Sequence, residues 1–204
     1  MLKFILYFIL LAAVAGAACG LFHLYRVSVK NKKEMAPYAD LSDEVTNNFG
    51  KTLVIYYSLT GKTKEIADKI KEKTNADLFE IKTAQPLPSG PKLHLAVREQ
   101  IKTQKYPALA QMPDISAYDT IFIGAPVWWY TAATPVLSLL DQLDFQGKKV
   151  VPFSTQGSNS GTFIEDFKAK IKNAVVGEYA SFNNLSKEYD KAVNAKIAAW
   201  LNKL

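Results

Sequence analysis

Residues 52–73 combine a strand pattern, a hydroxyl-rich turn and a helix pattern, and this stretch constrains the fold most strongly. Residues 52–57 form an unbroken run of β-branched, aromatic and aliphatic side chains, which is typical of a strand buried on both faces of a parallel sheet. The end of the stretch places Ile66, Ala67 and Ile70 on one helical face, with charged residues elsewhere. The stretch therefore predicts a buried strand, a turn and an amphipathic helix in direct succession.

The turn between this strand and this helix suits a phosphate group. It contains Ser58, Thr60, Gly61 and Thr63. A helix N-terminus carries unpaired N–H groups and a partial positive charge, three hydroxyls add donors, and Gly61 lets the backbone approach a ligand. The spacing matches neither the ATP-type phosphate loop nor the glycine motif of dinucleotide-binding proteins. An ordinary helix capped by Ser or Thr is the alternative interpretation.

The rest of the chain continues to alternate between strand and helix patterns, which predicts an α/β protein. Further strands are expected at residues 77–82, 120–125, 149–153 and 177–182. Further helices are expected at residues 94–103, 134–143, 162–171 and 186–204. Strand–helix units in series form a parallel sheet with helices on both faces. Because ligands bind at the carboxyl ends of such strands, the segment that follows each strand is informative.

Two more segments that follow expected strands have an unusual composition. Residues 126–135 begin and end with proline and contain Trp128, Trp129 and Tyr130. Consecutive aromatics in a loop favour a flat ligand that covers them, although packing beneath the loop is an alternative. Residues 154–161 are rich in Gly, Ser and Thr, so their N–H groups either approach a flat ligand or form a plain turn. Together with the hydroxyl-rich turn, these segments fit a ligand that has a phosphate and a planar polar ring system.

The N-terminal part of the chain is apolar enough to cross a membrane. Residues 4–25 contain no charged side chain apart from the titratable His23, and at about 1.5 Å per residue a helix of this length spans the roughly 30 Å hydrocarbon core. Lys3 precedes the span and four basic residues follow it, which favours a cytoplasmic position for the C-terminal side. A cleaved signal or a lipoprotein is the alternative, because small residues precede Cys19.

The net charge of +6 arises mostly beside this apolar span. Residues 1–34 hold five of the 25 basic residues and one of the 19 acidic ones, which leaves 20 and 18 for residues 35–204. The nearly neutral remainder gives no support to nucleic-acid binding, and the basic cluster is a topology signal or attracts anionic headgroups. The sequence has no Ser/His/Asp arrangement and no His/Cys cluster for a metal, and His94 is expected to be an ordinary surface or half-buried residue.

Three motifs resemble the flavodoxin family. Residues 58–63, Ser-Leu-Thr-Gly-Lys-Thr, resemble that family's phosphate loop, and residues 123–129, Ile-Gly-Ala-Pro-Val-Trp-Trp, resemble the Trp-Trp segment of one flavodoxin branch. Residues 152–157, Pro-Phe-Ser-Thr-Gln-Gly, resemble the ring-edge loop of that branch. The resemblance covers residues 52–204. It implies a flavodoxin-like three-layer sandwich with a five-stranded parallel sheet of order 2-1-3-4-5, to which the N-terminal transmembrane helix is added, and it implies FMN as the cofactor.

The resemblance also implies which residues contact FMN. The residues expected at the phosphate are Ser58, Thr60, Gly61, Lys62 and Thr63. The residues expected to flank the isoalloxazine ring are Pro126, Trp128, Trp129 and Tyr130. The residues expected along the polar edge of the ring are Ser154, Thr155 and Gly157. Tyr130 stands where the branch usually has Gly, and Gln156 stands where His is frequent, so both positions bear on ring stacking or flavin potential.

The sequence therefore favours a membrane-tethered FMN protein that carries electrons to or from a redox partner protein that it does not identify. The predicted organisation is an anchor or signal segment at residues 1–33, a polar tether at residues 34–51 and an FMN-binding domain at residues 52–204. An electron carrier is favoured over a turnover enzyme, and no nucleic acid or metal is expected. The alternatives are an FMN-dependent NAD(P)H or quinone oxidoreductase and a flavin-free scaffold module.

The expected location is the cell membrane, with the domain on the cytoplasmic face. In the alternative, the domain lies outside the cell, either anchored through a lipidated Cys19 or secreted.

Overall fold

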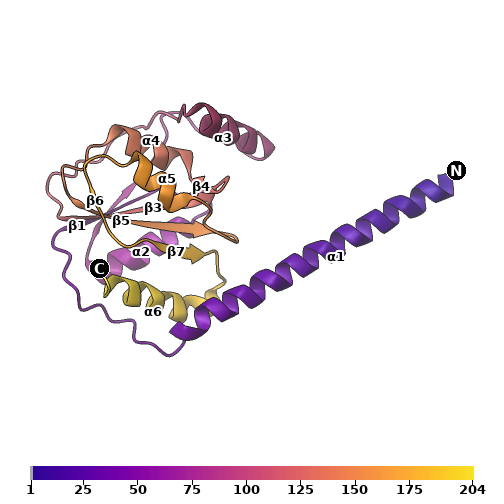
Figure 1. Cartoon of the computed structure of the whole chain (residues 1–204), viewed down its shortest axis with the longest axis horizontal. Coiled ribbons are helices and arrows are strands. Elements are labelled where there is room, and N and C mark those ends of the chain that lie inside the picture. The colour runs from indigo at the N-terminus through magenta and orange to yellow at the C-terminus, as the bar shows by residue number, and fades with distance from the viewer. Residues whose placement is uncertain (1) are drawn as a thin grey trace.

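The structure, a computed structural model, describes residues 2–204 (Figure 1). The strands are β1 (Thr52–Tyr56), β2 (Asp77–Glu80), β3 (Thr120–Trp128), β4 (Thr131–Ala132), β5 (Lys149–Gln156), β6 (Val175–Val176) and β7 (Ala180–Asn183). The α-helices are α1 (Leu2–Met35), α2 (Lys62–Thr74), α3 (Pro91–Thr103), α4 (Thr134–Gln142), α5 (Phe163–Lys170) and α6 (Asp190–Leu201). Two short 3-10 helices are η1 (Ala36–Tyr38) and η2 (Lys187–Tyr189).

The sheet has the order β2-β1-β3-β5-β6, and these strands pair in parallel. The predicted order is thereby confirmed, with one difference at its edge. The expected fifth strand is split, because β6 pairs with the first residues of β5 and β7 pairs with its last four. Between them the Glu178 carbonyl accepts a hydrogen bond from Trp200 Nε1 at 2.9 Å, so this carbonyl faces α6 and not a neighbouring strand.

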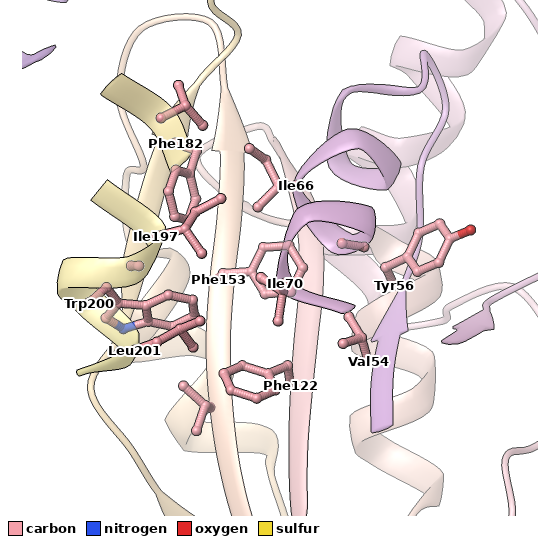
Figure 2. Close-up of a cluster of buried hydrophobic side chains, with 14 of the residues drawn as sticks. Val54, Tyr56, Ile66, Ile70, Phe122, Phe153, Phe182, Ile197, Trp200 and Leu201 are labelled. Atoms are coloured by element: carbon pink, nitrogen blue, oxygen red, sulfur yellow. The ribbon is translucent and has the colours of Figure 1, made fainter. Parts of the chain in front are cut away.

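Both faces of the sheet are buried, as the apolar strand patterns predict. On one face Val54, Phe122 and Phe153 pack against α2 and α6, and Figure 2 shows the Phe122 and Phe153 rings between these two helices. On the other face Leu53 and Ile121 belong to a second cluster with the apolar residues of α4 and α5. Alternate residues of one strand thus serve the two layers. α3 lies at the margin, and Val97 is its only buried residue.

The N-terminal helix α1 has two parts with different surroundings. Its apolar residues from position 4 to position 25 are exposed, and the helix is long and apolar enough to cross a membrane, as an N-terminal signal sequence also is. Nearer its C-terminal end, Val27, Asn31 and Glu34 are half-buried and Met35 is buried, whereas the residues between them are exposed. This spacing of four, three and one residues defines one helical face. The last turns of α1 are therefore packed on the domain.

Polar contacts fix the position of this docked end of α1. Asn183 Nδ2, at the end of β7, donates hydrogen bonds to Asn31 Oδ1 at 3.0 Å and to Glu34 Oε2 at 2.8 Å. Lys196 Nζ of α6 pairs with Glu34 Oε1 at 2.7 Å. Met35 is only 3% exposed and joins the apolar cluster under α2 and α6. The helix is therefore attached to the sheet edge where β7 ends and to the neighbouring helix α6.

The polar segment that follows α1 and η1 also contacts the domain. Thr46 N–H donates to Asn202 Oδ1 at 2.8 Å, and Asn202 Nδ2 donates to the Glu44 carbonyl at 2.9 Å. Lys73 Nζ, near the end of α2, pairs with Asp43 Oδ2 at 3.1 Å. The residues expected to form a tether thus run along the C-terminal ends of α6 and α2. The division of the chain into anchor, tether and domain stays a prediction.

We expect Met35→Ala to lower the free energy of unfolding of the detergent-solubilised full chain by about 2 kcal/mol, because the change removes buried methylene groups and leaves a cavity. Urea unfolding followed by tryptophan fluorescence measures the effect. Met112, which is 39% exposed, offers the matched control, and Met112→Ala should change the free energy by less than about 0.5 kcal/mol. Equal losses in the two variants would contradict the docking of α1.

Candidate functional site

Three segments meet at the carboxyl edge of the sheet. The turn after β1 opens into α2, the hairpin of β3 and β4 lies beside it, and the loop after β5 lies beyond that hairpin. The register aligns Pro126 of β3 with Thr155 of β5. Thr63 Oγ1, in the first turn of α2, lies 2.8 Å from Thr155 Oγ1 in a buried hydrogen bond. The segments that the sequence singles out are therefore physically joined.

The turn before α2 has unsatisfied donors. Gly61 is the N-cap residue with a φ of +87°, a left-handed conformation that favours glycine, and no side chain caps the helix. This excludes the alternative interpretation of the turn as an ordinary Ser/Thr cap. Within residues 2–204, Ser58 Oγ is the buried side-chain polar atom that has no hydrogen-bond partner. Free first-turn N–H groups, a partial positive charge and an orphaned hydroxyl together form a site for an anion.

Two residues predicted for the phosphate, Lys62 and Thr63, have side chains bonded to other parts of the protein, and their contact with a phosphate stays a prediction. Lys62 Nζ contacts Glu65 Oε2 and donates to the Leu185 carbonyl, both at 3.2 Å. Thr63 is 1% exposed, and its hydroxyl is engaged with Thr155. Thr60, by contrast, is exposed at the turn. Thr60 and Gly61 are therefore open to a phosphate, and Ser58 Oγ lies buried at the same turn without a partner. Lys62 and Thr63 make contacts that join the turn to the rest of the protein.

A pocket of about 370 Å³ opens beside the hairpin, within the size range of small-molecule sites. Four of the residues predicted to contact a ring line it, namely Trp128, Trp129, Tyr130 and Gly157. The other lining residues are Leu93, His94, Val97, Val127, Gln156, Ser158 and Asn159. Three predicted residues, Pro126, Ser154 and Thr155, do not line this pocket.

The tip of the hairpin has a strained backbone. Trp128 pairs with Thr131 across a two-residue turn, and the two central residues, Trp129 and Tyr130, have φ angles of +48° and +67°. Such turns normally carry Asn-Gly, because a bulky side chain is unfavourable at positive φ. Trp129 is 49% exposed and Tyr130 is 64% exposed, so burial does not offset the strain. Strained backbone conformations are most frequent at functional sites, and here the strained turn places two aromatic rings at the pocket mouth.

The loop after β5 holds this strained tip. Thr162 N–H donates to the Tyr130 carbonyl at 2.7 Å. A Cβ atom at Gly161 would lie 2.2 Å from the same carbonyl oxygen, so only glycine permits this approach. On the inner side of the pocket, the Tyr57 ring meets the Trp128 ring edge-on at 5.4 Å between centroids. The glycine-rich loop and the end of β1 thus support the aromatic residues from two directions.

A buried chain of hydrogen bonds runs from the core to the docked end of α1. Ser154 Oγ lies 2.5 Å from Tyr179 Oη and donates to Gln156 Oε1 at 2.8 Å. Gln156 Nε2 donates to Asn183 Oδ1 at 3.3 Å, and Asn183 donates in turn to Glu34. Burial raises the pKa of the Tyr179 phenol above its usual value, so the hydroxyl stays protonated at neutral pH. This chain fixes the Gln156 amide at the floor of the pocket.

Sequence reasoning missed the wall of the pocket that α3 supplies. Leu93, His94 and Val97 line it, although the sequence predicted only a helix at residues 94–103 and an ordinary role for His94. The helical periodicity was a usable signal for a packed face. It carried no information about the partner of that face, because a long proline-containing connection separates β2 from α3.

The comparison with known proteins decides the family. The model of the flavodoxin family matches residues 51–204. This chain belongs to the flavodoxin family. A flavoprotein from Lactobacillus acidophilus, solved in complex with FMN, is 30% identical with a TM-score of 0.60, and the match covers 65% of this chain and 93% of that one. No curated protein matches the chain.

Two further solved structures resemble this flavodoxin. A protein described as a flavoprotein from Bacteroides eggerthii is 26% identical with a TM-score of 0.60, over 76% of this chain and 97% of that one. The apo form of the Lactobacillus acidophilus flavoprotein, solved by NMR, is 29% identical with a TM-score of 0.52, over 72% of this chain and 99% of that one.

We expect Tyr130→Gly to raise the free energy of unfolding by about 1 kcal/mol, because glycine removes the penalty of a side chain at positive φ and little burial is lost. Chemical unfolding of the FMN-free chain measures the change. Leu41 is 48% exposed in a bend without a positive φ, so Leu41→Gly should not stabilise the chain. A loss of stability in Tyr130→Gly would show that the aromatic ring outweighs the backbone strain.

Proposed function

We propose that this flavodoxin binds one FMN at the carboxyl edge of its sheet and transfers electrons while anchored to a membrane. The observation that carries the proposal is the uncapped turn before α2, where the buried Ser58 Oγ has no partner within the described residues. An anionic group supplies the missing partner, and the aromatic pocket lies at the same edge. The FMN complex of the Lactobacillus acidophilus flavoprotein supports this choice of ligand.

Each part of the site has a defined role toward FMN. Ser58, Thr60 and the N–H groups around Gly61 would bind the phosphate, since their donors are free or exposed. Trp129 and Tyr130 would stack against the ring and exclude water from one side of it. Bound FMN supplies the chemistry of electron transfer, and the protein supplies position and electrostatics.

An FMN-dependent oxidoreductase is the second candidate function. The observation in its favour is His94, a side chain capable of proton transfer that lines the pocket and is exposed to solvent. An electron carrier needs no such group, because it passes electrons to its partner without transferring a proton to a substrate. Oxidation of NAD(P)H by the purified chain without any partner protein would favour the oxidoreductase, and its absence would favour the carrier.

The anchor in this proposal is the apolar part of α1, residues 4–25, and the domain faces the cytoplasm. The length and composition of the helix support a membrane span, and the basic residues that follow it support this orientation. Cleavage before a lipidated Cys19, or secretion, would place the same domain outside the cell. The flavin site is unaffected by this choice, because none of its residues lies before position 57.

We expect the full chain to take up about one FMN, with the absorbance near 450 nm that flavins show as a property of the cofactor itself.

We expect Ser58→Ala and Thr60→Ala to weaken FMN binding far more than riboflavin binding, because these hydroxyls should meet only the phosphate. Each lost charge-assisted hydrogen bond costs about 1.5–3 kcal/mol, or about tenfold or more in the dissociation constant. Titration with each ligand, followed by fluorescence, measures both constants.

The matched control is Thr74→Ala at the opposite end of α2, where the hydroxyl bonds only to the Ile70 carbonyl. It should leave the affinities for FMN and riboflavin unchanged. Equal losses for the two ligands in the Ser58 and Thr60 variants would refute the phosphate site. A chain that remains colourless after incubation with excess FMN would refute the function and would favour a flavin-free scaffold.

We expect a tag placed after Leu204 to be protected from protease added to intact cells, because basic residues after the span resist translocation. Neutralising the basic residues at positions 26, 30, 32 and 33 should raise the fraction of tag that is digested. Neutralising four exposed lysines of the domain should not. Complete digestion of the tag in the unaltered chain would overturn the cytoplasmic orientation.

A further inference from the structure

The docked end of α1 lies directly beside the candidate flavin site. Lys30 Nζ donates to the carbonyl of Ser158, a residue that lines the pocket. Lys30 is four residues from Arg26, where the apolar part of α1 ends, and this separation is about 6 Å along a helix. The glycine-rich loop on one side of the pocket is therefore about one helical turn from the hydrocarbon part of α1.

The apolar part of α1 extends from the domain on the side where the pocket opens. Figure 1 shows α1 leaving the domain on the side toward which the arrowheads of β3 and β5 point, with α3 projecting on that side as well. The pocket mouth lies at these carboxyl ends, between α3, the hairpin and the loop after β5. A membrane crossed by the apolar part of α1 would therefore face the pocket mouth, and the amino edge of the sheet would face away from it.

The surface around the mouth is basic and aromatic. On α3, the exposed residues Lys92, Leu95, Arg98 and Lys102 follow one another at intervals of three, three and four and so share one helical face. Beside this face are the exposed Trp129 and Tyr130. We call these six residues the rim surface. Arg98 lies 5.9 Å from the Trp129 ring centroid, which joins the helix to the hairpin. Glu99, the one acidic residue of α3, is also exposed and lies on the same face, four residues after Leu95 and three before Lys102, so the three basic residues outnumber it there.

This composition fits the surface of an anionic membrane. Trp and Tyr are enriched at the level of lipid headgroups, where one part of the ring is apolar and another is wet. Lys and Arg near a membrane are attracted to anionic lipids. The end of α1 is basic as well, because Lys30, Lys32 and Lys33 lie among the docking residues just beyond the apolar span. An exposed Leu95, 68% accessible, has no cover within the described residues.

We propose that the rim surface rests on the anionic lipid headgroups of the membrane that α1 crosses, so that the mouth of the flavin site opens at the membrane surface. The contacts of Asn183 and Lys196 with α1 hold the domain in this orientation. The inference rests on the proposed anchorage and does not require the FMN assignment. It also holds for a chain anchored through a lipidated Cys19, because the docked turns of α1 follow that position.

The test measures how close the rim surface comes to lipid headgroups. The full chain with Cys19→Ser and Leu95→Cys is labelled with a fluorescent probe and reconstituted into vesicles of phosphatidylcholine and phosphatidylglycerol that contain a headgroup-spin-labelled lipid. We expect the spin label to quench the probe at position 95 at least about twofold more than a probe at position 175. Val175 is the matched control, since it is 64% exposed and lies at the opposite, amino edge of the sheet.

A second arm tests the charge. Lys92→Glu combined with Lys102→Glu should lower the quenching at position 95, as should vesicles of phosphatidylcholine alone or high salt. Lys71→Glu combined with Lys203→Glu changes the net charge equally at exposed positions away from the rim surface and should have no effect. Quenching that is independent of both lipid charge and the α3 lysines would overturn the proposed anionic contact.

The outcomes separate this inference from the proposed function. Equal quenching at positions 95 and 175, or none at 95, in a chain that floats with the vesicles and shows flavin absorbance would overturn the inference and leave FMN binding standing. A chain that does not float with the vesicles would overturn both the anchorage and the orientation. A chain that is quenched selectively at position 95 but stays colourless with FMN would support the orientation and refute the function.

Discussion

The burial of the central sheet on both faces is the constraint on which the rest of the structure depends. Phe122 of β3 and Phe153 of β5 are fully buried against α2 and α6. Ile121 and Ile123, the neighbours of Phe122 in β3, are fully buried on the other face of the sheet, in the cluster of α4 and α5. A strand covered on both faces leaves only its ends open to ligands. The parallel pairing gathers the carboxyl ends at one edge, so the three functional segments meet there as a consequence of packing.

Small polar contacts then convert this edge into a defined site. The Thr63–Thr155 bond joins the turn before α2 to β5, and the Thr162–Tyr130 bond joins the hairpin to the loop after β5. Each contact connects segments that are distant in the sequence. The sheet holds these segments beside one another, so the geometry of the site depends on the sheet. The same principle extends to α1, since Asn183 connects the floor of the pocket to the N-terminal helix. The position of the N-terminal helix and the position of the site are therefore mechanically linked.

Much of the fold and part of the candidate site could be predicted because their signals are local. Residues 52–57 read as a buried strand, and the turn at Ser58 and Gly61 follows directly, so its chemistry needs no tertiary information. Residues such as His94 and Asn159 could not be assigned to the pocket, because their role depends on which segments the sheet brings beside them. The sequence could not show that Lys62 and Thr63 also bond to Leu185 and Thr155, because these partners are far away in the chain.

By itself, the sequence determined the alternation of strands and helices, the order of the motifs and the apolar N-terminal helix, because hydrophobic periodicity and turn chemistry act between near neighbours. Only the tertiary structure decided that Trp129 and Tyr130 stand at positive φ, since that conformation is imposed by the hairpin register and by the close approach of Gly161. Only the tertiary structure also decided that the last turns of α1 pack on Asn183 and Lys196. These contacts join residues 152 and 162 positions apart, and no local pattern records which surfaces will meet.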